Sequence, residues 1–198
     1  MKNTPQKKSS TLPTMLFEQK QDWLTWLTDN HSTSSGVWLQ LAKKGVDVKS
    51  VSYDQAIEVA LCFGWIDGQK KALNDQYWLQ RVTPRSAKSI WSNINKEKAL
   101  ALIKSGIMAP AGLKEVERAK LDGRWDAAYD SASKSSVPSD FQSALDGNLR
   151  AKKFFETLDS RNRYSVLFRI QTAKRAETRA KKISQFVEML ANHENIHP

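Results

Sequence analysis

In residues 52–71, SYDQAIEVALCFGWIDGQKK, a helix is expected to end and a strand to begin, which determines how the elements on either side are arranged. Ser52 and Gln55 have the spacing of a capping box, which predicts that the helix begins here. Apolar residues then recur at helical spacing as far as Phe63. Gly64 supplies the left-handed residue that commonly ends a helix, so the chain changes its local structure at this glycine.

A β-hairpin is expected directly after this change. Its two arms are WIDGQKKAL and YWLQRV, with the turn at Asn74 and Asp75. Upstream, the segment VWLQLA is typical of a strand with one apolar face, formed by Val37, Leu39 and Leu41. Earlier still, MLFEQKQDWLTWLTDN predicts a helix over 15–30, with apolar residues at Leu16, Trp23, Leu24 and Leu27.

Beyond Pro84 the apolar pattern becomes helical. The segment SIWSNINKEKALALIKSG predicts a helix with an apolar face of Ile90, Ile94, Leu100 and Ile103. A shorter helix, GLKEVERAKLDG, is closed by Gly123. After the Ser-rich linker SASKSSVPSD, four consecutive helical patterns predict a compact antiparallel helical unit.

The fold class is therefore α+β, with a small antiparallel sheet packed with helices and followed by a C-terminal helical module. We expect a disordered tail over residues 1–14, an α+β domain over 15–130 and a basic helical module over 138–198. The tail is polar and offers little apolar surface to bury.

Composition excludes several classes of protein. No stretch of 18 consecutive apolar residues occurs, so no membrane span is expected. The single cysteine, Cys62, cannot form an internal disulfide, which favours a reducing cytoplasm, and it is expected to be a small core residue. The three histidines have no zinc-site spacing, so neither a metal nor another cofactor is expected.

One group of residues suited to ligand binding lies around the predicted hairpin. Arginines flanked by tryptophan can bind an anionic or carboxylate ligand through bidentate hydrogen bonds and stacking. The candidates are Trp65, Asp67, Tyr77, Arg81, Arg85, Trp91 and Asn95. The alternative is structural, with Asp67 in a buried ion pair with Arg81 or Arg85 while the tryptophans fill the core.

A second candidate surface lies in the C-terminal module. Between Asn148 and Lys182 the chain has 11 basic and three acidic residues, out of a net charge of +10. The patch expected on two consecutive helices consists of Arg161, Arg163, Arg169, Lys174, Arg175, Arg179 and Lys182. Such a patch suits phosphate groups, including those of nonspecifically bound nucleic acid. The alternative is an ordinary solvated helical face.

Four segments occur in a fixed order: ALCFGWIDGQ, QRVTPRSAKSIWSNIN, SGIMAPAGLKEVERAKLDGRWDAAY and AKRAETRAKKISQFVEML. Together they resemble the YdeI/OmpD-associated family, also called bacteriocin-protection proteins. The resemblance runs from about Met15 to the end, and from about Pro138 it is to the family's C-terminal module. Two departures are Val82, where members often have Phe before Thr-Pro-Arg, and Ala176, where they usually have Pro.

The resemblance implies a role in tolerance of bacteriocins or cationic antimicrobial peptides and a link to an outer-membrane porin. It implies no reaction, cofactor or catalytic residue. We therefore expect a soluble, non-catalytic binding or adaptor protein in envelope stress, whose partner is a protein or a small anionic ligand. The alternatives are a nucleic-acid-associated protein acting through the basic patch and an enzyme of unknown reaction at an Asp67/Arg81 cleft. A basic surface opposes direct capture of cationic peptides unless the fold forms an acidic cleft.

Overall fold

The computed structural model describes residues 12–198, which form two compact units. Within the described residues, the first unit consists of residues up to 89 together with 97–122. The second unit consists of residues 90–96 together with 123–198. The boundary therefore falls inside helix α3 (Asn93–Lys104), whose first turn groups with the second unit.

The predicted first domain, 15–130, extends past the first unit, because two of its segments group with the C-terminal helices. Asp130 explains this grouping through its hydrogen bonds. Its carboxylate accepts from Asn93 Nδ2 at 2.8 Å, and its carbonyl accepts from the Tyr164 hydroxyl at 2.9 Å. These bonds join residues 90–96 and 123–130 to a C-terminal helix within one unit.

The first unit has a four-stranded sheet with helices packed against it, which confirms the predicted α+β class. Its strands and helices are β1 (Thr14–Leu16), α1 (Lys20–Asn30), β2 (Val37–Ala42), α2 (Tyr53–Cys62), β3 (Trp65–Ala72), β4 (Tyr77–Pro84), the larger part of α3, and α4 (Pro110–Leu121). The strand order is β1-β2-β4-β3, with β1 parallel to β2 and the other pairs antiparallel. The sheet is thus mixed, whereas an antiparallel one is predicted, because α1 connects β1 to β2 as a crossover.

Strand β1 begins inside the segment 1–14 that is predicted to be a disordered tail. Of the predicted tail, residues 1–11 lie outside the described residues, whereas Thr14 begins β1, so the prediction is wrong at that residue. The Pro13 carbonyl accepts a hydrogen bond from Trp38 N at 2.8 Å. Leu16 belongs to this strand, and the helix expected over 15–30 begins only at Lys20. Pairing with β2 outweighs the helical spacing of the apolar residues here.

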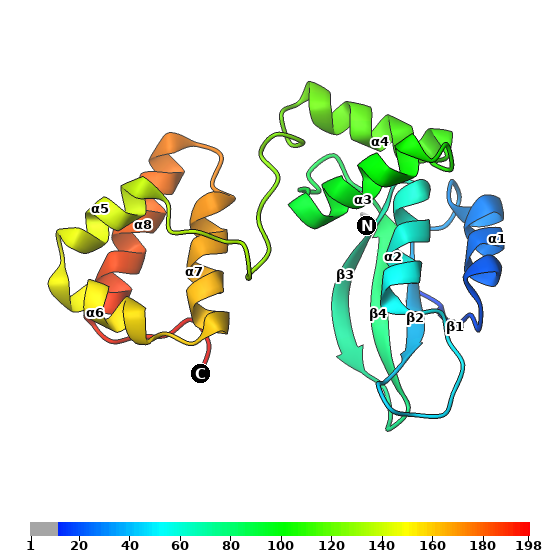
Figure 1. The fold of residues 1–198 in the computed structure, drawn as a ribbon, viewed down its shortest axis with the longest axis horizontal. Coiled ribbons are helices and arrows are strands. Elements are labelled where there is room, and N and C mark those ends of the chain that lie inside the picture. Colours follow the sequence, from blue (N-terminus) through cyan, green and yellow to red (C-terminus); the bar gives the residue numbers. More distant parts are fainter. Residues whose placement is uncertain (1–11) are drawn as a thin grey trace, which may run out of the picture. The chain divides into compact units, whose positions relative to one another are not determined.

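Residues 52–84 form the predicted helix and hairpin. Ser52 and Gln55 form the capping box of α2, and Gly64 has a left-handed φ of 72°. The hairpin of β3 and β4 turns at Asn74, whose side chain accepts from Tyr77 N at 2.8 Å. Helix α2 lies along one face of the sheet (Figure 1).

The core of the first unit lies between that face and the helices. Trp23 and Leu27 of α1 and Ala56, Val59 and Ala60 of α2 pack against the sheet. The sheet contributes Val37, Leu39, Leu41, Trp65 and Val82. On α3 the buried residues are Ala99 and Leu102, whereas the predicted face is wrong at Ile94 and Leu100, which are 44% and 47% exposed.

Strand β3 contains a bulge between Asp67 and Lys70. Two residues of β3, Gly68 and Gln69, stand opposite a single residue of β4. The amide of Gln80, which is completely buried, donates to the carbonyls of Gly68 and Gln69 at 3.1 and 3.3 Å. This side chain therefore holds the irregular backbone in place.

The second unit confirms the four predicted helical patterns. They form α5 (Ser139–Asp146), α6 (Leu149–Thr157), α7 (Ser160–Gln171) and α8 (Ala176–Ala191). Asn148 and Asp159 cap α6 and α7 through their side chains. Phe141, Phe155, Val166, Ile170 and Leu190 are part of one apolar core between the helices. Within residues 12–198, no helix combines the length and the apolar character needed to cross a membrane.

Helix α4 approaches the end of α2 more closely than a side chain would allow. A Cβ at Gly112 would overlap the carbonyl oxygen of Cys62 and lie 2.8 Å from that of Leu61. On the other side of the contact, a Cβ at Gly64 would lie 2.9 Å from the carbonyl oxygen of Ala111. Two glycines therefore permit the backbone contact between α4 and the α2–β3 turn.

Gly112→Ala is expected to lower the free energy of unfolding by about 2 to 3 kcal/mol, because the added methyl group meets backbone rather than a movable side chain. Urea denaturation followed by tryptophan fluorescence measures this loss. Gly68→Ala is the matched control, since its Cβ would have only ordinary contacts, the nearest at 3.8 Å. Equal stability of the two variants would contradict the close contact between α4 and the end of α2.

Candidate functional site

A pocket of about 290 Å³ opens where α4 meets the α2–β3 turn. It is lined by His31, Ser32, Phe63, Gly64, Trp65, Pro84, Arg85, Ala111, Lys114, Glu115 and Arg118. We call it the Trp65–Arg85 pocket. It contains two of the residues predicted for ligand binding, and both come from the hairpin strands or their ends.

Hydrogen bonds fix the walls of the Trp65–Arg85 pocket. The indole nitrogen of Trp65 donates to the carbonyl of His31 at 3.2 Å, which ties β3 to the end of α1. The backbone nitrogen of Arg85 donates to the carbonyl of Gly64 at 3.0 Å. Arg118 donates to the carbonyl of Ser86 at 3.0 Å. Hydrogen bonds to backbone carbonyls thus hold the pocket at three of its edges.

The lining of this pocket has more positive than negative charge. Arg85, Lys114 and Arg118 contribute cations, whereas Glu115 is the one carboxylate in the lining and is paired with Arg118. The Arg85 side chain is 5% exposed, and Trp65 is fully buried beside it. A carboxylate or phosphate group of a small ligand fits this chemistry, since guanidinium groups bind such anions in a bidentate manner.

Asp67 does not join this pocket. Its carboxylate accepts a hydrogen bond from the Tyr53 hydroxyl at 2.8 Å, in an exposed position between α2 and β3. Among the described residues it forms no ion pair with Arg81 or Arg85, so the structural alternative of a buried Asp–Arg pair is wrong. The Lys70 ammonium lies over the Tyr53 ring, 5.1 Å from the ring centre.

The remaining predicted ligand residues are divided between other places. Tyr77 and Arg81 stand on the sheet face opposite the helices, as their pairing with Ala42 and Trp38 requires. Trp91 and Asn95 belong to the second unit. There Trp91 is buried with its ring 4.9 Å from that of Trp125.

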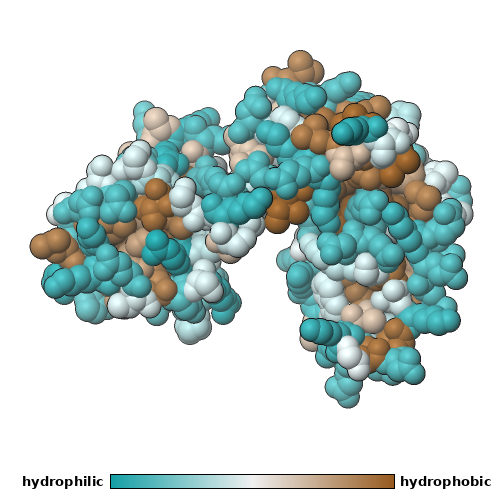
Figure 2. Space-filling view, in the orientation of Figure 1, coloured by the Kyte–Doolittle hydropathy of each residue, from teal (hydrophilic) through white to brown (hydrophobic). Residues whose placement is uncertain are grey.

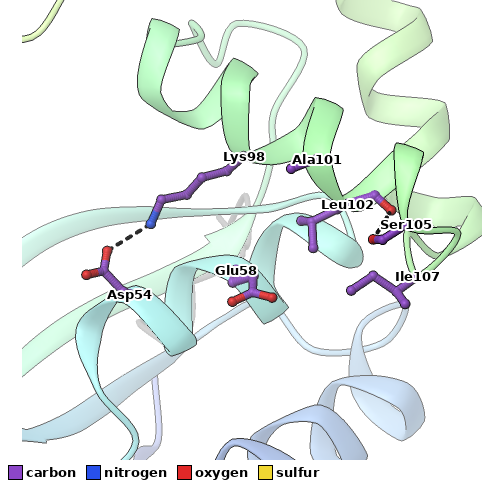
Figure 3. Close-up of a pocket in the computed structure, with 7 residues that line it drawn as sticks. All are labelled: Asp54, Glu58, Lys98, Ala101, Leu102, Ser105 and Ile107. Atoms are coloured by element: carbon purple, nitrogen blue, oxygen red, sulfur yellow. Dashed lines mark hydrogen bonds and ion pairs between the residues drawn. The ribbon is translucent and has the colours of Figure 1, made fainter.

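A second concave site lies between α2 and α3 and has a volume of about 330 Å³ (Figure 3). We call it the α2–α3 groove, lined by Asp54, Glu58, Lys98, Ala101, Leu102, Ser105 and Ile107. Asp54 pairs with Lys98 at 2.8 Å, and Glu58 pairs with Lys20 at 2.9 Å. Figure 3 shows both carboxylates on α2. The Asp54 carboxylate points to the Lys98 ammonium, and Glu58 lies nearer to Leu102 and Ile107.

Helices α3 and α4 and the segment between them also have exposed apolar side chains. Leu100, Ile107 and Leu121 are exposed by 47%, 57% and 89%, and Ile107 is part of the groove lining. Figure 2 shows hydrophobic surface over the part of the first unit formed by α3 and α4. The groove therefore combines an acidic rim with an apolar wall, a combination that sequence patterns missed because the acids and the wall come from separate helices.

Cys62, at the end of α2, confirms its predicted role as a core residue. It is 6% exposed, and burial, together with the negative charge of Glu58, raises the pKa of its thiol to about 11. A buried thiol with such a pKa is protonated near neutral pH, which opposes a role as a nucleophile. Within residues 12–198, no cluster of His, Cys, Asp and Glu has the geometry of a metal site.

In the predicted basic patch, several side chains have structural partners. Arg179 binds the Asp140 carboxylate at 2.6 and 2.8 Å, which lowers the pKa of Asp140, and it also donates to the Ile170 carbonyl. Lys182 donates to the carbonyl of Arg169 at 3.0 Å, and Arg163 lies over the Phe155 ring. The exposed members of the patch are Arg161, Lys174 and Arg175. Binding of phosphate groups by the patch stays a prediction.

Comparisons with known proteins divide the chain in the same region as its fold. Residues 15–115 match the family model of a domain of unknown function (DUF8412). Residues 134–193 match the family model described as bacteriocin-protection, YdeI or OmpD-associated, which confirms the predicted resemblance for the C-terminal part. Neither the curated proteins nor the solved structures include a match to this chain.

Asp67→Asn is expected to lower the free energy of unfolding by no more than about 1 kcal/mol, because the hydrogen bond to Tyr53 is exposed and asparagine keeps an acceptor. Urea denaturation of this variant, of Tyr53→Phe and of the double variant measures the coupling between the two side chains. A loss of about 3 to 5 kcal/mol would instead indicate a broken buried ion pair and contradict the geometry described above.

Proposed function

Since the chain belongs to the bacteriocin-protection, YdeI or OmpD-associated family through residues 134–193, and to the family of the unknown-function domain through 15–115, we propose that it is a non-catalytic binding protein. In this role the protein contributes to the tolerance of bacteriocins or other cationic antimicrobial peptides under envelope stress. A cytoplasmic location, suggested by the single cysteine, is part of the same proposal.

One observation carries the proposal, namely the acidic rim and apolar wall of the α2–α3 groove. A cationic amphipathic peptide has the complementary pattern, with ammonium or guanidinium groups beside apolar side chains. Asp54 and Glu58 lie one helical turn apart on α2, so both face the same side of the helix. Leu102 and Ile107 supply the apolar side of the groove.

The overall positive charge of the chain does not oppose this proposal. The described part of the first unit has 14 Lys and Arg residues and 12 Asp and Glu residues, so it is close to neutral. Lys98 and Lys20, which pair with the two carboxylates, have side chains 29% and 40% exposed. A peptide cation can therefore replace them at little cost, because exposed ion pairs contribute little free energy.

A synthetic amphipathic Lys/Leu peptide is expected to bind the full chain in calorimetric titration at low salt. Asp54→Asn combined with Glu58→Gln should weaken this binding by about tenfold, which corresponds to ~0.7 kcal/mol for each carboxylate. Asp75→Asn combined with Glu117→Gln makes the same change in net charge outside the groove and should leave the affinity unchanged. Cells with the groove variant should also survive a peptide challenge less well than cells with the control.

Equal affinity of the parent and the groove variant would contradict this proposal. Binding that is lost in the groove variant, with survival unchanged, would contradict the role in tolerance but leave the binding site standing. Circular dichroism of each variant shows whether the fold is retained.

The Trp65–Arg85 pocket favours a second function, the binding of a small anionic ligand. Its specific support is the excess of cations over Glu115 beside a buried tryptophan. Titration with citrate is expected to raise the melting temperature, and Lys114→Gln should reduce this shift. Lys104→Gln, which removes an exposed lysine outside the pocket, is the control. A shift equal in both variants would indicate nonspecific binding and contradict the assignment.

A further inference from the structure

The sheet of the first unit has a second face with a distinct composition. Side chains of directly paired residues in an antiparallel sheet stand on the same face. Val37 and Val82 are such a pair, and both belong to the core beneath the helices. Residues next to these two in their strands stand on the opposite face, which we call the outer face. Its residues include Trp38, Gln40, Lys71, Tyr77, Leu79 and Arg81.

Aromatic rings and cations lie together on the outer face. Trp38 on β2 stands directly opposite Arg81 on β4. Lys71 reaches across from β3, with its ammonium 4.4 Å from the centre of the Trp38 ring. This contact shows that Lys71 and Trp38 share a face, although a strand separates them. The rings of Trp38 and Tyr77 are half-buried, so part of each is open to a ligand.

None of these six residues of the outer face is acidic, and neither are Ala42, Ile66 and Thr83, which the register places on the same face. Asp67, the acidic residue of β3, stands on the helix face, where it contacts Tyr53. The two sheet faces therefore differ in charge, since the acid and the cations are on opposite sides. A polyanion that also offers flat rings is the ligand complementary to the outer face.

We propose that the outer face of the sheet binds single-stranded nucleic acid. Proteins that bind single-stranded nucleic acid combine a positively charged groove, which binds the phosphates, with aromatic side chains on which bases stack. Here Lys71 and Arg81 bind phosphates, and bases stack on Trp38 and Tyr77. Tyr77 and Arg81 are four residues apart on one strand, about 13 Å, so the face spans more than one nucleotide.

The outer face suits this ligand better than the basic patch of the second unit does. Arg179 and Lys182 of that patch are held by Asp140 and by backbone carbonyls, as described above. Arg163 already lies over the ring of Phe155. On the outer face, in contrast, the contact that holds the exposed Lys71 among residues 12–198 is the one with the Trp38 ring, which a stacked base can replace.

The probe is a fluorescently labelled oligothymidine strand, titrated with the full chain at low salt and followed by anisotropy. The parent protein is expected to bind it, with an affinity that falls steeply as salt is added. Lys71→Gln combined with Arg81→Gln should weaken binding by at least fivefold and reduce the slope of log K against log salt by about 1.4, the value for two phosphate contacts on a single strand.

Two further variants distinguish the contribution of base stacking, and of the position of the charges, from that of net charge alone. Trp38→Leu combined with Tyr77→Leu keeps the net charge and should weaken binding by at least about fivefold, the lower range for loss of a base–aromatic stack. Lys88→Gln combined with Lys104→Gln removes the same charge elsewhere in the first unit and should leave the affinity within twofold of the parent. Thermal unfolding confirms that each variant is folded.

Three results would overturn the proposal. The first is no binding of the oligothymidine by the parent at low salt. The second is equal affinity of the parent and both outer-face variants. The third is loss of binding in Lys174→Gln combined with Arg175→Gln while the outer-face variants bind normally, which would place the site on the basic patch. Tighter binding of duplex than of single-stranded DNA would also count against stacking of unpaired bases.

Discussion

The backbone contact between α4 and the turn after α2 determines much of the first unit. Because residue 112 has no side chain, α4 lies directly on the last carbonyls of α2, and Gly64 accepts the same proximity from the other side. The left-handed turn at Gly64 then directs Trp65 into the core and presents its carbonyl to Arg85. This one close contact therefore positions α4 and the start of β3, and both of them line the Trp65–Arg85 pocket.

The same arrangement leaves α2 with three different environments. One side packs on the sheet through Ala56, Val59 and Ala60. Its C-terminal end contacts α4. Its remaining side carries Asp54 and Glu58 toward α3, where no closer packing fills the space. The groove lies beside α2 and the Trp65–Arg85 pocket lies beyond its C-terminal end. They differ in charge because the carboxylates of the groove come from α2, whereas the cations of the pocket come from α4 and from Arg85 after β4.

Much of the fold was predictable from local patterns. The capping box at Ser52, the glycine stop at Gly64 and the alternation in VWLQLA each reflect short-range physics, and each predicts the structure found. The short strand β1 was not predictable in this way, because a distant strand stabilises it. The apolar face of α3 was wrong because Ile94 and Leu100 follow helical spacing but point away from the core.

The candidate sites were less predictable than the fold. Trp65 and Arg85 come together because Gly64 accepts a backbone hydrogen bond from Arg85. Lys114 and Arg118 were missed, since nothing in their own helix marks them as neighbours of the hairpin. Asp67 was paired with arginines by residue type alone, whereas its partner is decided by the face of the sheet on which it stands.

The bulge in β3 decides on which face of the sheet Lys70 and the residues after it stand. In a regular strand, residues three apart point in opposite directions, yet Asp67 and Lys70 share the helix face because one extra residue lies between them. Loss of Gly68 or Gln69 would restore a regular ladder while every pair before and after it kept its partner. An alignment gap of one residue is therefore compatible with this fold at the bulge, whereas a gap elsewhere in β3 would exchange its two faces.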